Sequence, residues 1–397
     1  MENNNTIRTP LILIVDDNPK NLQVLGNYLQ NEGYKVEFAL DGNSALDWIE
    51  RTEFDLILLD IMMPGMDGFE VCRNIKYGQV NQKTPVIFLT AKIDTESIVN
   101  AFDLGAVDYV IKPFNQKELI ARVKTQIEIK RGRDEIAKNL KEIEYKNKLI
   151  KYSIQYAHII QAAVLKASMN GSDFFPEMFC LILPKDIVSG DFYWFHRIDN
   201  KILVGVFDCT GHGVPGAFMS MLGITLLNET VIRERIVEPH LILNRVREKI
   251  IEALGQKGIC AEVRDGMDGS IISYDLKSKY LVYSGAFNPM YLIRDNKINE
   301  FKGDRMTLSY QDRISDFSRQ EIKTKPDDLI YLFTDGYMDQ FGGQEEKKFR
   351  RAQFRQILLR NHKNPLEVQK EMLLDTYLKW RGKEEQVDDI TVVGLKL

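Results

Sequence analysis

The first third of the chain alternates short apolar runs with amphipathic stretches of helical period. The first helical stretch begins with Asn18 and Pro19, a cap residue followed by proline at the first helical position. Five apolar runs have the length of strands: LILIV (11–15), KVEFAL (35–40), LILLD (56–60), VIFLT (86–90) and YVIK (109–112). Strands that alternate with helices of this size predict a parallel sheet covered on both faces. We therefore expect a doubly wound α/β domain over residues 11–127, preceded by a flexible polar tail at 1–10.

A segment rich in Lys and Glu follows, and its apolar residues recur at 3-4 spacing. A first series comprises Ile120, Val123 and Ile127. A second series, one residue out of frame, comprises Ile136, Leu140, Ile143, Ile150, Ile154, Ala157 and Val164, with Asn147 and Gln161 at two core positions. Two heptad-like stretches separated near Gly132 predict an interrupted parallel coiled coil over residues 128–170, and with it a homodimer through the linker helices. The alternative is a single amphipathic helix that packs on its own domain.

Residues 171–397 are richer in strands. Strand-like runs lie at 192–195, 202–208, 270–276, 280–287, 289–294, 329–333 and 390–395. Long helical stretches are expected at about 215–232, 238–254, 350–361 and 366–380. This mixture predicts an α+β domain.

The composition narrows the class of protein. The 397 residues are 44% apolar and 28% charged with a formal net charge of −4, which fits a soluble protein of two or three domains. This charge gives no reason to expect nucleic acid as a partner, and we find no basic recognition helix of a DNA-binding regulator. The cysteines form no C-x-x-C pair, which favours a reducing compartment over a disulfide framework or zinc site: Cys72, Cys180, Cys209 and Cys260. With no signal peptide and no apolar run of membrane length, we expect a cytoplasmic protein without membrane contact.

Polar residues collect at the carboxyl ends of the first five strands. Asp16 and Asp17 follow the first strand, and Asp60, Thr90 and Lys112 end the third, fourth and fifth. Open parallel sheets bind ligands at this edge, so these side chains are expected to meet there. Two carboxylates at ~4 Å repel by about 4 kcal/mol at an effective dielectric of ~20. A hard cation, Mg²⁺ first, would resolve this repulsion, while Lys112 and Thr90 would contact phosphoryl oxygens.

These residues resemble the signature of response-regulator receiver domains, which have a CheY-like fold. The matching segments are DD (16–17), LLDIMMPGMDG (58–68), Thr90 and KPF (112–114). The resemblance implies that Asp60 accepts a phosphoryl group from a histidine kinase or another phosphodonor. It also implies a Mg²⁺ site made by Asp16, Asp17, Asp60 and the Met62 carbonyl.

The same resemblance implies a switch made by Thr90 and Tyr109. It further implies that the Lys112–Pro113 peptide bond is cis.

Isolated aspartates also mark strand ends in the second half. Asp191 lies in SGDFYWF, Asp208 ends the 202–208 run, Asp335 lies in TDG, and Asp388 and Asp389 precede the last strand. Each of these aspartates, taken alone, would be assigned to a turn at the end of a strand. Together with TGHGVPGAFMS, whose glycines open a helix, they predict a cluster of four or five carboxylates for Mg²⁺ or Mn²⁺ rather than zinc.

Residues 185–397 resemble the metal-dependent (PPM) serine/threonine protein phosphatases, in particular the bacterial SpoIIE/RsbU type of sporulation and stress-sigma control. The matching motifs are GD (190–191), D-x-x-G-H-G (208–213), TDG (334–336) and DDIT (388–391). The resemblance implies a β-sandwich flanked by helices and a centre of two Mn²⁺ or Mg²⁺ ions. Its ligands would be the bridging Asp208, the Cys209 carbonyl, Asp191, Asp335 and Asp388, with Asp389 as a less certain member. The implied substrate is a phosphorylated protein resembling an anti-anti-sigma factor (STAS domain).

Two departures from the family pattern qualify this prediction. Eukaryotic relatives place a histidine where this chain has Thr210. We assign His212 no acid role, because holding the loop at the helix start accounts for it at least as well. Few basic residues lie near the motifs, which leaves phosphate recognition mostly to the metals. The alternative is a degenerate phosphatase fold that acts as a phosphorylation-controlled binding protein.

The arrangement of the two halves suggests a coupling hypothesis. Phosphorylation of Asp60 would change the packing near Tyr109, re-pair the linker helices and move a metal-binding loop. The shift of heptad frame near Gly132 is the candidate bistable element.

Overall fold

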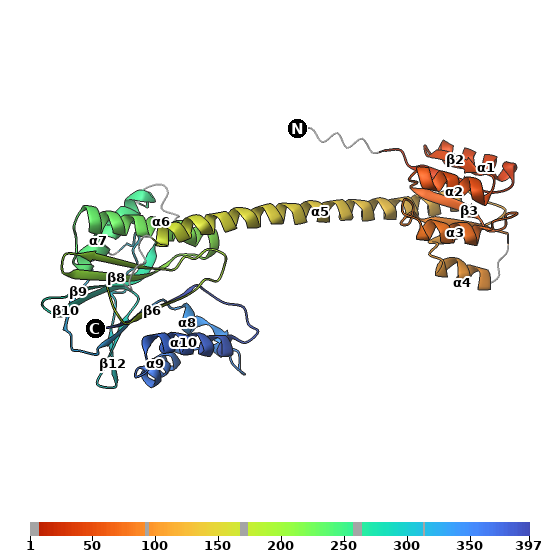
Figure 1. The fold of residues 1–397 in the computed structure, drawn as a ribbon. Helices are drawn as coiled ribbons and strands as arrows, with labels where there is room; N and C mark the ends of the chain where they lie inside the picture. The colour runs from red at the N-terminus through yellow and green to blue at the C-terminus, as the bar shows by residue number, and fades with distance from the viewer. Residues whose placement is uncertain (1–7, 92–94, 167–173, 257–263, 313) are drawn as a thin grey trace. The chain divides into compact units, whose positions relative to one another are not determined.

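The computed structural model describes residues 8–91, 95–166, 174–256, 264–312 and 314–397 (Figure 1). Most of the predicted N-terminal tail, and Cys260, lie outside the described residues. The chain divides into two compact units, Met1–Asn147 and Lys148–Leu397, and each is described by itself.

The first unit contains a five-stranded parallel sheet with strand order β2-β1-β3-β4-β5. The prediction of a doubly wound α/β fold is therefore confirmed. Central strands β3 and β4 are buried along their whole length because helices cover both faces. The strands are β1 (Leu11–Val15), β2 (Lys35–Ala39), β3 (Leu56–Asp60), β4 (Val86–Thr90) and β5 (Asp108–Ile111).

Alternate residues of each strand point to opposite faces of the sheet. Leu13 and Ile57 pack with α2, α3 and α4, whereas Ile14 and Leu58 pack with α1 and the first turns of α5. Asn18 caps α1 as predicted, its side chain accepting a hydrogen bond from the Lys20 amide at 3.0 Å. The helices are α1 (Pro19–Asn31), α2 (Gly42–Arg51), α3 (Gly68–Tyr77), α4 (Thr95–Asp103) and α5 (Gln116–Lys166).

Helix α5 is one continuous helix of 51 residues. It passes through Gly132, so the predicted interruption of the helix was wrong. Glycine disfavours a helix by only about 1 kcal/mol, and the flanking Lys, Arg and Glu residues are good helix formers. The first apolar series belongs to the core of the first unit, because Val123 and Ile127 are buried against the sheet.

The second apolar series of α5 is divided between two environments. Ile136, Leu140, Ile143 and Ile150 are each more than half exposed. Gln161 is buried, and Val164 packs against the core of the second unit. Both ends of α5 therefore pack on a domain, as the alternative prediction of an amphipathic helix requires. The middle of the described helix carries an exposed apolar stripe.

The second unit is a sandwich of two five-stranded antiparallel sheets, with orders β13-β10-β9-β8-β7 and β12-β11-β14-β17-β6. Val204 and Ile272 of one sheet meet Leu332 and Val393 of the other in a shared core. A separate pair is formed by β15 (Phe341–Gly342) and β16 (Lys347–Lys348). The sandwich strands are β6 (Met178–Leu183), β7 (Phe192–Ile198), β8 (Lys201–Cys209), β9 (Met267–Asp275), β10 (Tyr280–Ala286), β11 (Met290–Arg294), β12 (Lys297–Phe301), β13 (Gln320–Lys323), β14 (Leu329–Phe333) and β17 (Ile390–Lys396).

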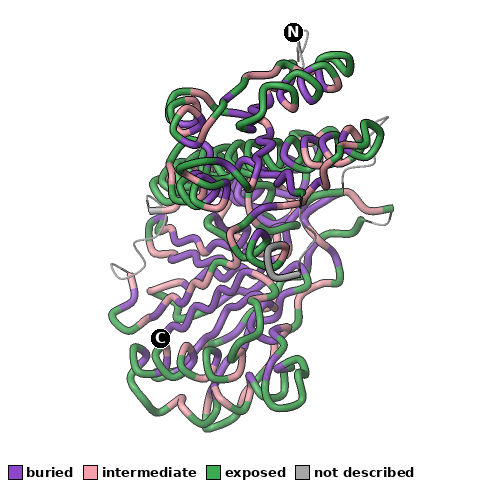
Figure 2. The backbone as a smooth tube through the Cα atoms, turned by 90° about the vertical axis from the view of Figure 1, so that its right-hand side faces the viewer, coloured by how far each residue is buried: buried purple, intermediate pink, exposed green. Residues whose placement is uncertain are grey.

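Helices cover the outer face of each sheet, as predicted for this half. α6 and α7 pack on the β7–β10 sheet, and α9 and α10 pack on the other. The strands are mostly buried in Figure 2, whereas the last helices expose their outer sides. The helices are α6 (Gly213–Asn228), a π-helical turn (Glu229–Arg233), α7 (Pro239–Ala253), α8 (Gly336–Asp339), α9 (Arg350–Asn361) and α10 (Leu366–Arg381).

Several strands were missed from the sequence. β12 and β13 are edge strands whose side chains are mostly exposed or half-buried, so they lack the apolar run that marks a buried strand. Among the described helices, none combines the length and the hydrophobicity that crossing a membrane requires.

Candidate active sites

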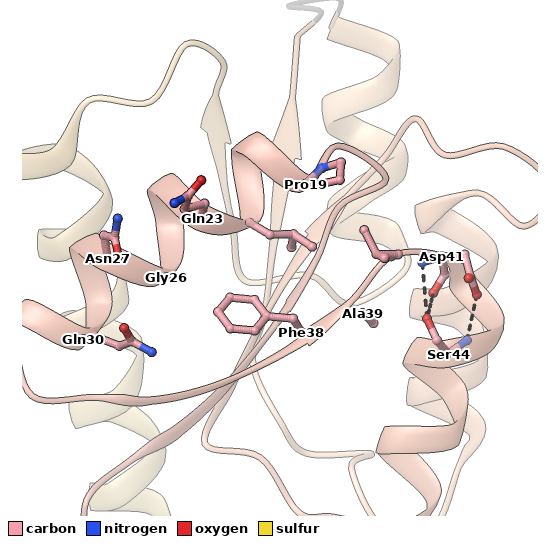
Figure 3. Close-up of a pocket in the computed structure, with 11 residues that line it drawn as sticks. Pro19, Gln23, Gly26, Asn27, Gln30, Phe38, Ala39, Asp41 and Ser44 are labelled. Atoms are coloured by element: carbon pink, nitrogen blue, oxygen red, sulfur yellow. Dashed lines mark hydrogen bonds between the residues drawn. The ribbon is translucent and has the colours of Figure 1, made fainter.

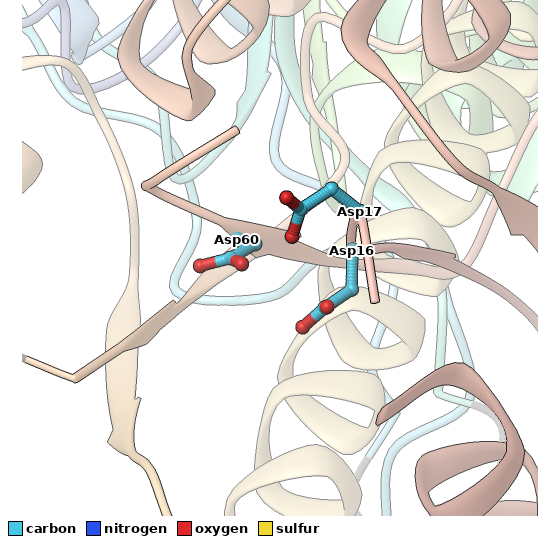
Figure 4. Close-up of side chains that lie close together, drawn as sticks. All are labelled: Asp16, Asp17 and Asp60. Carbon is cyan, nitrogen blue, oxygen red and sulfur yellow. The ribbon is translucent and has the colours of Figure 1, made fainter. Parts of the chain in front are cut away.

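Three carboxylates of the first unit lie together at the carboxyl ends of β1 and β3 (Figure 4). One oxygen each of Asp16, Asp17 and Asp60 lies within 4.8 Å of the others. Asp16 and Asp60 are buried, at 0% and 4% exposure, and Asp17 is exposed. The structure therefore brings together the three acids that were predicted from the strand ends. One of them, Asp17, is exposed to solvent.

Lys112 neutralises the two buried acids. Its Nζ lies 2.7 Å from Asp16 Oδ2 and 2.6 Å from Asp60 Oδ2. Burial raises the pKa of Asp60, and the hydrogen bond and charge of Lys112 offset part of that rise. Burial also lowers the pKa of Lys112, but the two carboxylates outweigh it and the net shift is upward. Lys112 thus stays charged and available to an anion at this site.

The loops around the site orient the acids further. The Asn18 amide and the Asn21 side chain each donate to Asp16 Oδ1 at 2.9 Å. The Met62 amide donates to Asp60 Oδ1 at 3.3 Å. Asn21, which the sequence analysis missed, is identifiable only once α1 is known to begin at Pro19, because the helix turns it back toward Asp16.

The remaining residues predicted for this site lie on β4, on β5 and directly after β5. Thr90 is buried at the end of β4, and the Lys112–Pro113 peptide is cis as predicted. Tyr109 is half-buried on β5, with its ring 6.3 Å from that of Phe102 in an edge-to-face arrangement.

A separate hollow of about 670 Å³ lies between α1 and the β2 end (Figure 3). Phe38 lines it, and a Cβ at Gly26 would come within 2.7 Å of that ring. Asp41, the ionisable group on its wall, is engaged in capping α2 with Ser44. The residues that line this hollow therefore include no ionisable group that is free for catalysis.

In the second unit, the predicted aspartates lie on or next to strands of both sheets. Asp191 precedes β7 and Asp208 lies on β8, while Asp335 follows β14 and Asp388 precedes β17. Asp268 on β9 is the direct cross-strand partner of Asp208. Sequence analysis missed Asp268 because its relation to Asp208 depends on the pairing of two strands about sixty residues apart.

These carboxylates destabilise one another's ionised forms. Burial, followed by the charges of Asp191, Asp335, Asp388 and Asp268, raises the pKa of Asp208 well above its ordinary value. Burial raises the pKa of Asp191 to about 8 and that of Asp268 to about 6. The shared influence on Asp208 indicates that the predicted acids form one electrostatic cluster.

The cluster suits a hard divalent cation. Its donors are all oxygens, and the buried Oδ1 of Asp268 has no hydrogen-bond partner. No three of these acids within the described ranges approach each other as closely as Asp16, Asp17 and Asp60 do. Cations would relieve both the unpaired oxygen and the mutual repulsion.

Asp389 differs from its neighbour Asp388. Its two carboxylate oxygens accept hydrogen bonds from the backbone amides of Lys185 and Gly190, each at 2.7 Å. The Thr334 hydroxyl similarly donates to Asp191 Oδ2 at 2.6 Å. The Asp389 bonds tie the loop before Asp191 to the start of β17, and the Thr334 bond ties Asp191 to the segment after β14.

The D-x-x-G-H-G loop is packed tightly against its neighbours. Gly211 adopts φ +82°, and a Cβ at Gly216 would lie 2.3 Å from the Gly211 carbonyl oxygen. His212 Nδ1 lies 2.7 Å from Asp186 Oδ2, which supports the predicted loop-holding role. The Thr210 hydroxyl accepts from the Gly266 amide and donates to the Gly266 carbonyl. Thr210 thus ties this loop to the segment before β9.

Two basic residues that follow Asp335 by 13 and 16 residues act on the acid cluster. The pKa of Asp335 is raised by burial and nearby acids, while the charges of Arg351 and Lys348 act to lower it. Arg351 and Lys348 thus act on Asp335, although we expected few basic residues near the motifs.

Two family models match the chain. The response regulator receiver domain matches residues 12–124, and Stage II sporulation protein E (SpoIIE) matches residues 198–397. The second match covers half of the chain.

Relatives support both matches. The DNA-binding response regulator MtrA of Mycolicibacterium smegmatis is 42% identical over 129 residues, covering 32% of this chain and 54% of MtrA. The chain thus spans about half the length of that curated relative. The SiaA-PP2C domain of Pseudomonas aeruginosa is 31% identical with a TM-score of 0.58, covering 64% of this chain and 98% of that domain. Together with the two acid sites, these matches establish that the chain belongs to the SpoIIE family of PPM-type phosphatases and carries a response regulator receiver domain.

Proposed function

We propose that this protein is a cytoplasmic response regulator whose output is hydrolysis of phosphoserine or phosphothreonine on a partner protein. The observation that carries the proposal is the presence, in one chain, of a lysine-neutralised acid trio and a second cluster of buried acids. The functional division follows the predicted limits, with a receiver at 11–127, a linker at 128–170 and a phosphatase at 171–397.

In the receiver, Asp60 is the proposed phosphoacceptor. An Asp60 oxygen attacks the phosphorus of a phosphohistidine, so that a P–O bond forms and the P–N bond of the donor breaks. Lys112, already 2.6 Å from Asp60, pairs with a phosphoryl oxygen of the product. Asp16, Asp17, Asp60 and the Met62 carbonyl would hold Mg²⁺, which supplies positive charge to the transferring group. Thr90 and Tyr109 are the proposed switch.

In the phosphatase, the proposed ligands of two Mn²⁺ or Mg²⁺ ions are Asp191, Asp208, the Cys209 carbonyl, Asp335 and Asp388. Asp268 joins this set on the strength of its unpaired oxygen and its position opposite Asp208. Bound ions of this kind lower the pKa of a coordinated water and so provide a nucleophile at neutral pH. Asp389 is assigned a structural role, because backbone amides engage both of its oxygens.

Gln161 is the residue through which we propose that α5 acts on the metal centre. Its buried Nε2 donates to the Ser189 carbonyl at 2.6 Å and to the Ser220 hydroxyl at 2.9 Å. Ser189 lies two residues before Asp191, and Ser220 lies on α6. A displacement of α5 therefore acts on an acid of the cluster without an intervening element.

Phosphorylation would control this contact through pairing of the linker. The exposed stripe of Ile136, Leu140, Ile143 and Ile150 has coiled-coil spacing, which supports a homodimer through α5. Because α5 is continuous, the change we propose is in the pairing of two helices rather than in a break within one.

The partners follow from the family resemblance. The phosphodonor we propose is a histidine kinase, and the substrate is a phosphorylated protein resembling an anti-anti-sigma factor. A degenerate, non-catalytic binding protein is disfavoured because carboxylates occupy every motif position.

The test is turnover of p-nitrophenyl phosphate by the full chain with Mn²⁺. Wild type should hydrolyse it, and beryllium fluoride, which mimics the phosphoryl group on Asp60, should change the rate. Asp208→Asn should be inactive, whereas Asp199→Asn, an exposed change in the β7–β8 turn, should behave as wild type. Absence of turnover at any Mn²⁺ concentration would support a binding protein instead.

A further inference from the structure

A groove of about 650 Å³ lies between β12 and α9. Its apolar lining includes Ile298 and Leu359, and its basic lining consists of Lys297, Arg351 and Arg355. The groove thus combines a hydrophobic surface with three cations.

Most of this positive charge is not compensated within the protein. Arg355 pairs with Glu300 at 3.2 Å. In the part of the chain that the structure describes, the side chains of Lys297 and Arg351 form no ion pair or hydrogen bond, and both residues are exposed. Two cations are therefore free to pair with a ligand, in a chain whose net charge is −4.

One end of the groove is formed by the first turn of α9, which packs beside α8. The Phe354 ring of α9 lies 5.1 Å from the ring of Tyr337, which belongs to α8 and follows Asp335 by two residues. Lys348 Nζ pairs with Asp339 Oδ2 at 2.8 Å, and Asp339 belongs to α8, which starts directly after Asp335. The β15–β16 hairpin and the start of α9 thus place cations beside the proposed metal centre.

We propose that this groove binds an acidic segment of the phosphoprotein substrate, adjacent to the phosphorylated residue. The inference rests on the proposed phosphatase function and adds a determinant of substrate choice. A guanidinium pairs well with carboxylates, and the apolar lining accommodates a neighbouring side chain. A long nucleic acid is a poorer match, because the adjacent acid cluster would repel its continuous phosphate backbone.

The experiment compares two synthetic phosphoserine peptides of equal length on the Mn²⁺-loaded full chain. One carries glutamates on both sides of the phosphoserine, and the other carries glutamines at the same positions. Wild type should show a kcat/KM about tenfold higher for the acidic peptide, falling in high salt. Arg351→Gln and Lys297→Gln should each reduce this preference by about threefold to fivefold, the effect of an exposed ion pair worth up to roughly 1 kcal/mol.

The matched control is Arg360→Gln. Arg360 is an exposed arginine near the end of the same helix and does not line the groove, so the peptide preference should stay at the wild-type value. Binding of a fluorescein-labelled, unphosphorylated acidic peptide to the metal-free chain gives a second readout. Arg351→Gln should weaken this binding, and Arg360→Gln should not.

The outcomes separate the two proposals. Equal kcat/KM for the two peptides in an enzyme that hydrolyses p-nitrophenyl phosphate would overturn the docking site and leave the phosphatase intact. An equally strong effect of Arg360→Gln would overturn it too, since the preference would then reflect overall charge. Tighter binding of a DNA oligonucleotide than of the acidic peptide would assign the groove to nucleic acid. No hydrolysis of any of the phosphoesters would remove both proposals.

Discussion

The two acid clusters of this protein solve the same electrostatic problem differently. The three acids of the receiver lie close together, and the Lys112 ammonium contacts two of them. The phosphatase cluster draws its acids from both sheets of a sandwich, and burial and mutual repulsion raise the pKa of several of them. An internal cation balances the buried acids of the first site, where we propose that transient phosphorylation occurs. We propose that the second site depends on cations from solution.

The largest expected effect is on the phosphatase cluster. Asp208→Asn should reduce kcat for p-nitrophenyl phosphate by more than about 100-fold, because loss of a direct ligand exceeds the 10- to 100-fold effect of outer-shell changes. Circular dichroism should show the fold retained. Retention of more than a tenth of wild-type activity would argue against Asp208 as a ligand.

Removing the Lys112 charge should make the stability of the receiver depend on an added cation, as we propose for the second cluster. Lys112→Met leaves buried Asp16 and Asp60 without their partner, and we expect the free energy of unfolding to fall by roughly 2–4 kcal/mol. Mg²⁺ should restore more stability to this variant than to wild type. Lys117→Met, an exposed lysine on α5, is the control and should change stability little. Calorimetry of the full chain measures both; an identical response to Mg²⁺ would contradict the assigned role of Lys112.

The contact between α5 and the metal centre should have an intermediate effect. Gln161→Leu removes one donor to the Ser189 carbonyl and the acceptor of the Ser189 amide, and loss of these buried bonds costs about 1–3 kcal/mol of local stability. We expect kcat to change about tenfold and the response to beryllium fluoride to disappear. Gln155→Leu, an exposed position on the same helix, should preserve both. A normal beryllium fluoride response in Gln161→Leu would place the coupling elsewhere.

The smallest expected effect is the pH dependence of metal stabilisation. The pKa of Asp191 lies near 8 in the metal-free fold and near 3.8 when exposed, so the folded state binds the extra proton between these values. Stability without metal therefore falls as pH rises through this window. Mn²⁺ displaces the protons, so it should raise Tm by about 3–6 °C more at pH 8 than at pH 6. A larger rise at pH 6 would reverse the assigned sign.

The receiver site was predictable from sequence because its geometry follows from a single rule. In a parallel sheet, successive strand ends meet at one edge, so locating the strands located Asp16, Asp60 and Lys112. The sandwich follows no such rule. Asp268 became visible only through its pairing with Asp208, and Arg351 only through the packing of α9.

Neighbouring residues also took roles that spacing could not separate. Asp388 and Asp389 are equivalent in sequence, yet only Asp389 is engaged by the Lys185 and Gly190 amides. Gln161 occupies a heptad core position but bonds to Ser189 and Ser220, 28 and 59 residues away. Periodicity identifies which face of a helix is buried, but not which partner buries it.

The most direct test of whether the second cluster binds cations from solution is equilibrium dialysis of the full chain against Mn²⁺ at pH 8. Wild type should retain two more ions per chain than Asp208→Asn, whatever the receiver itself binds. Equal stoichiometry in wild type and Asp208→Asn would mean that the sandwich acids do not form a metal centre.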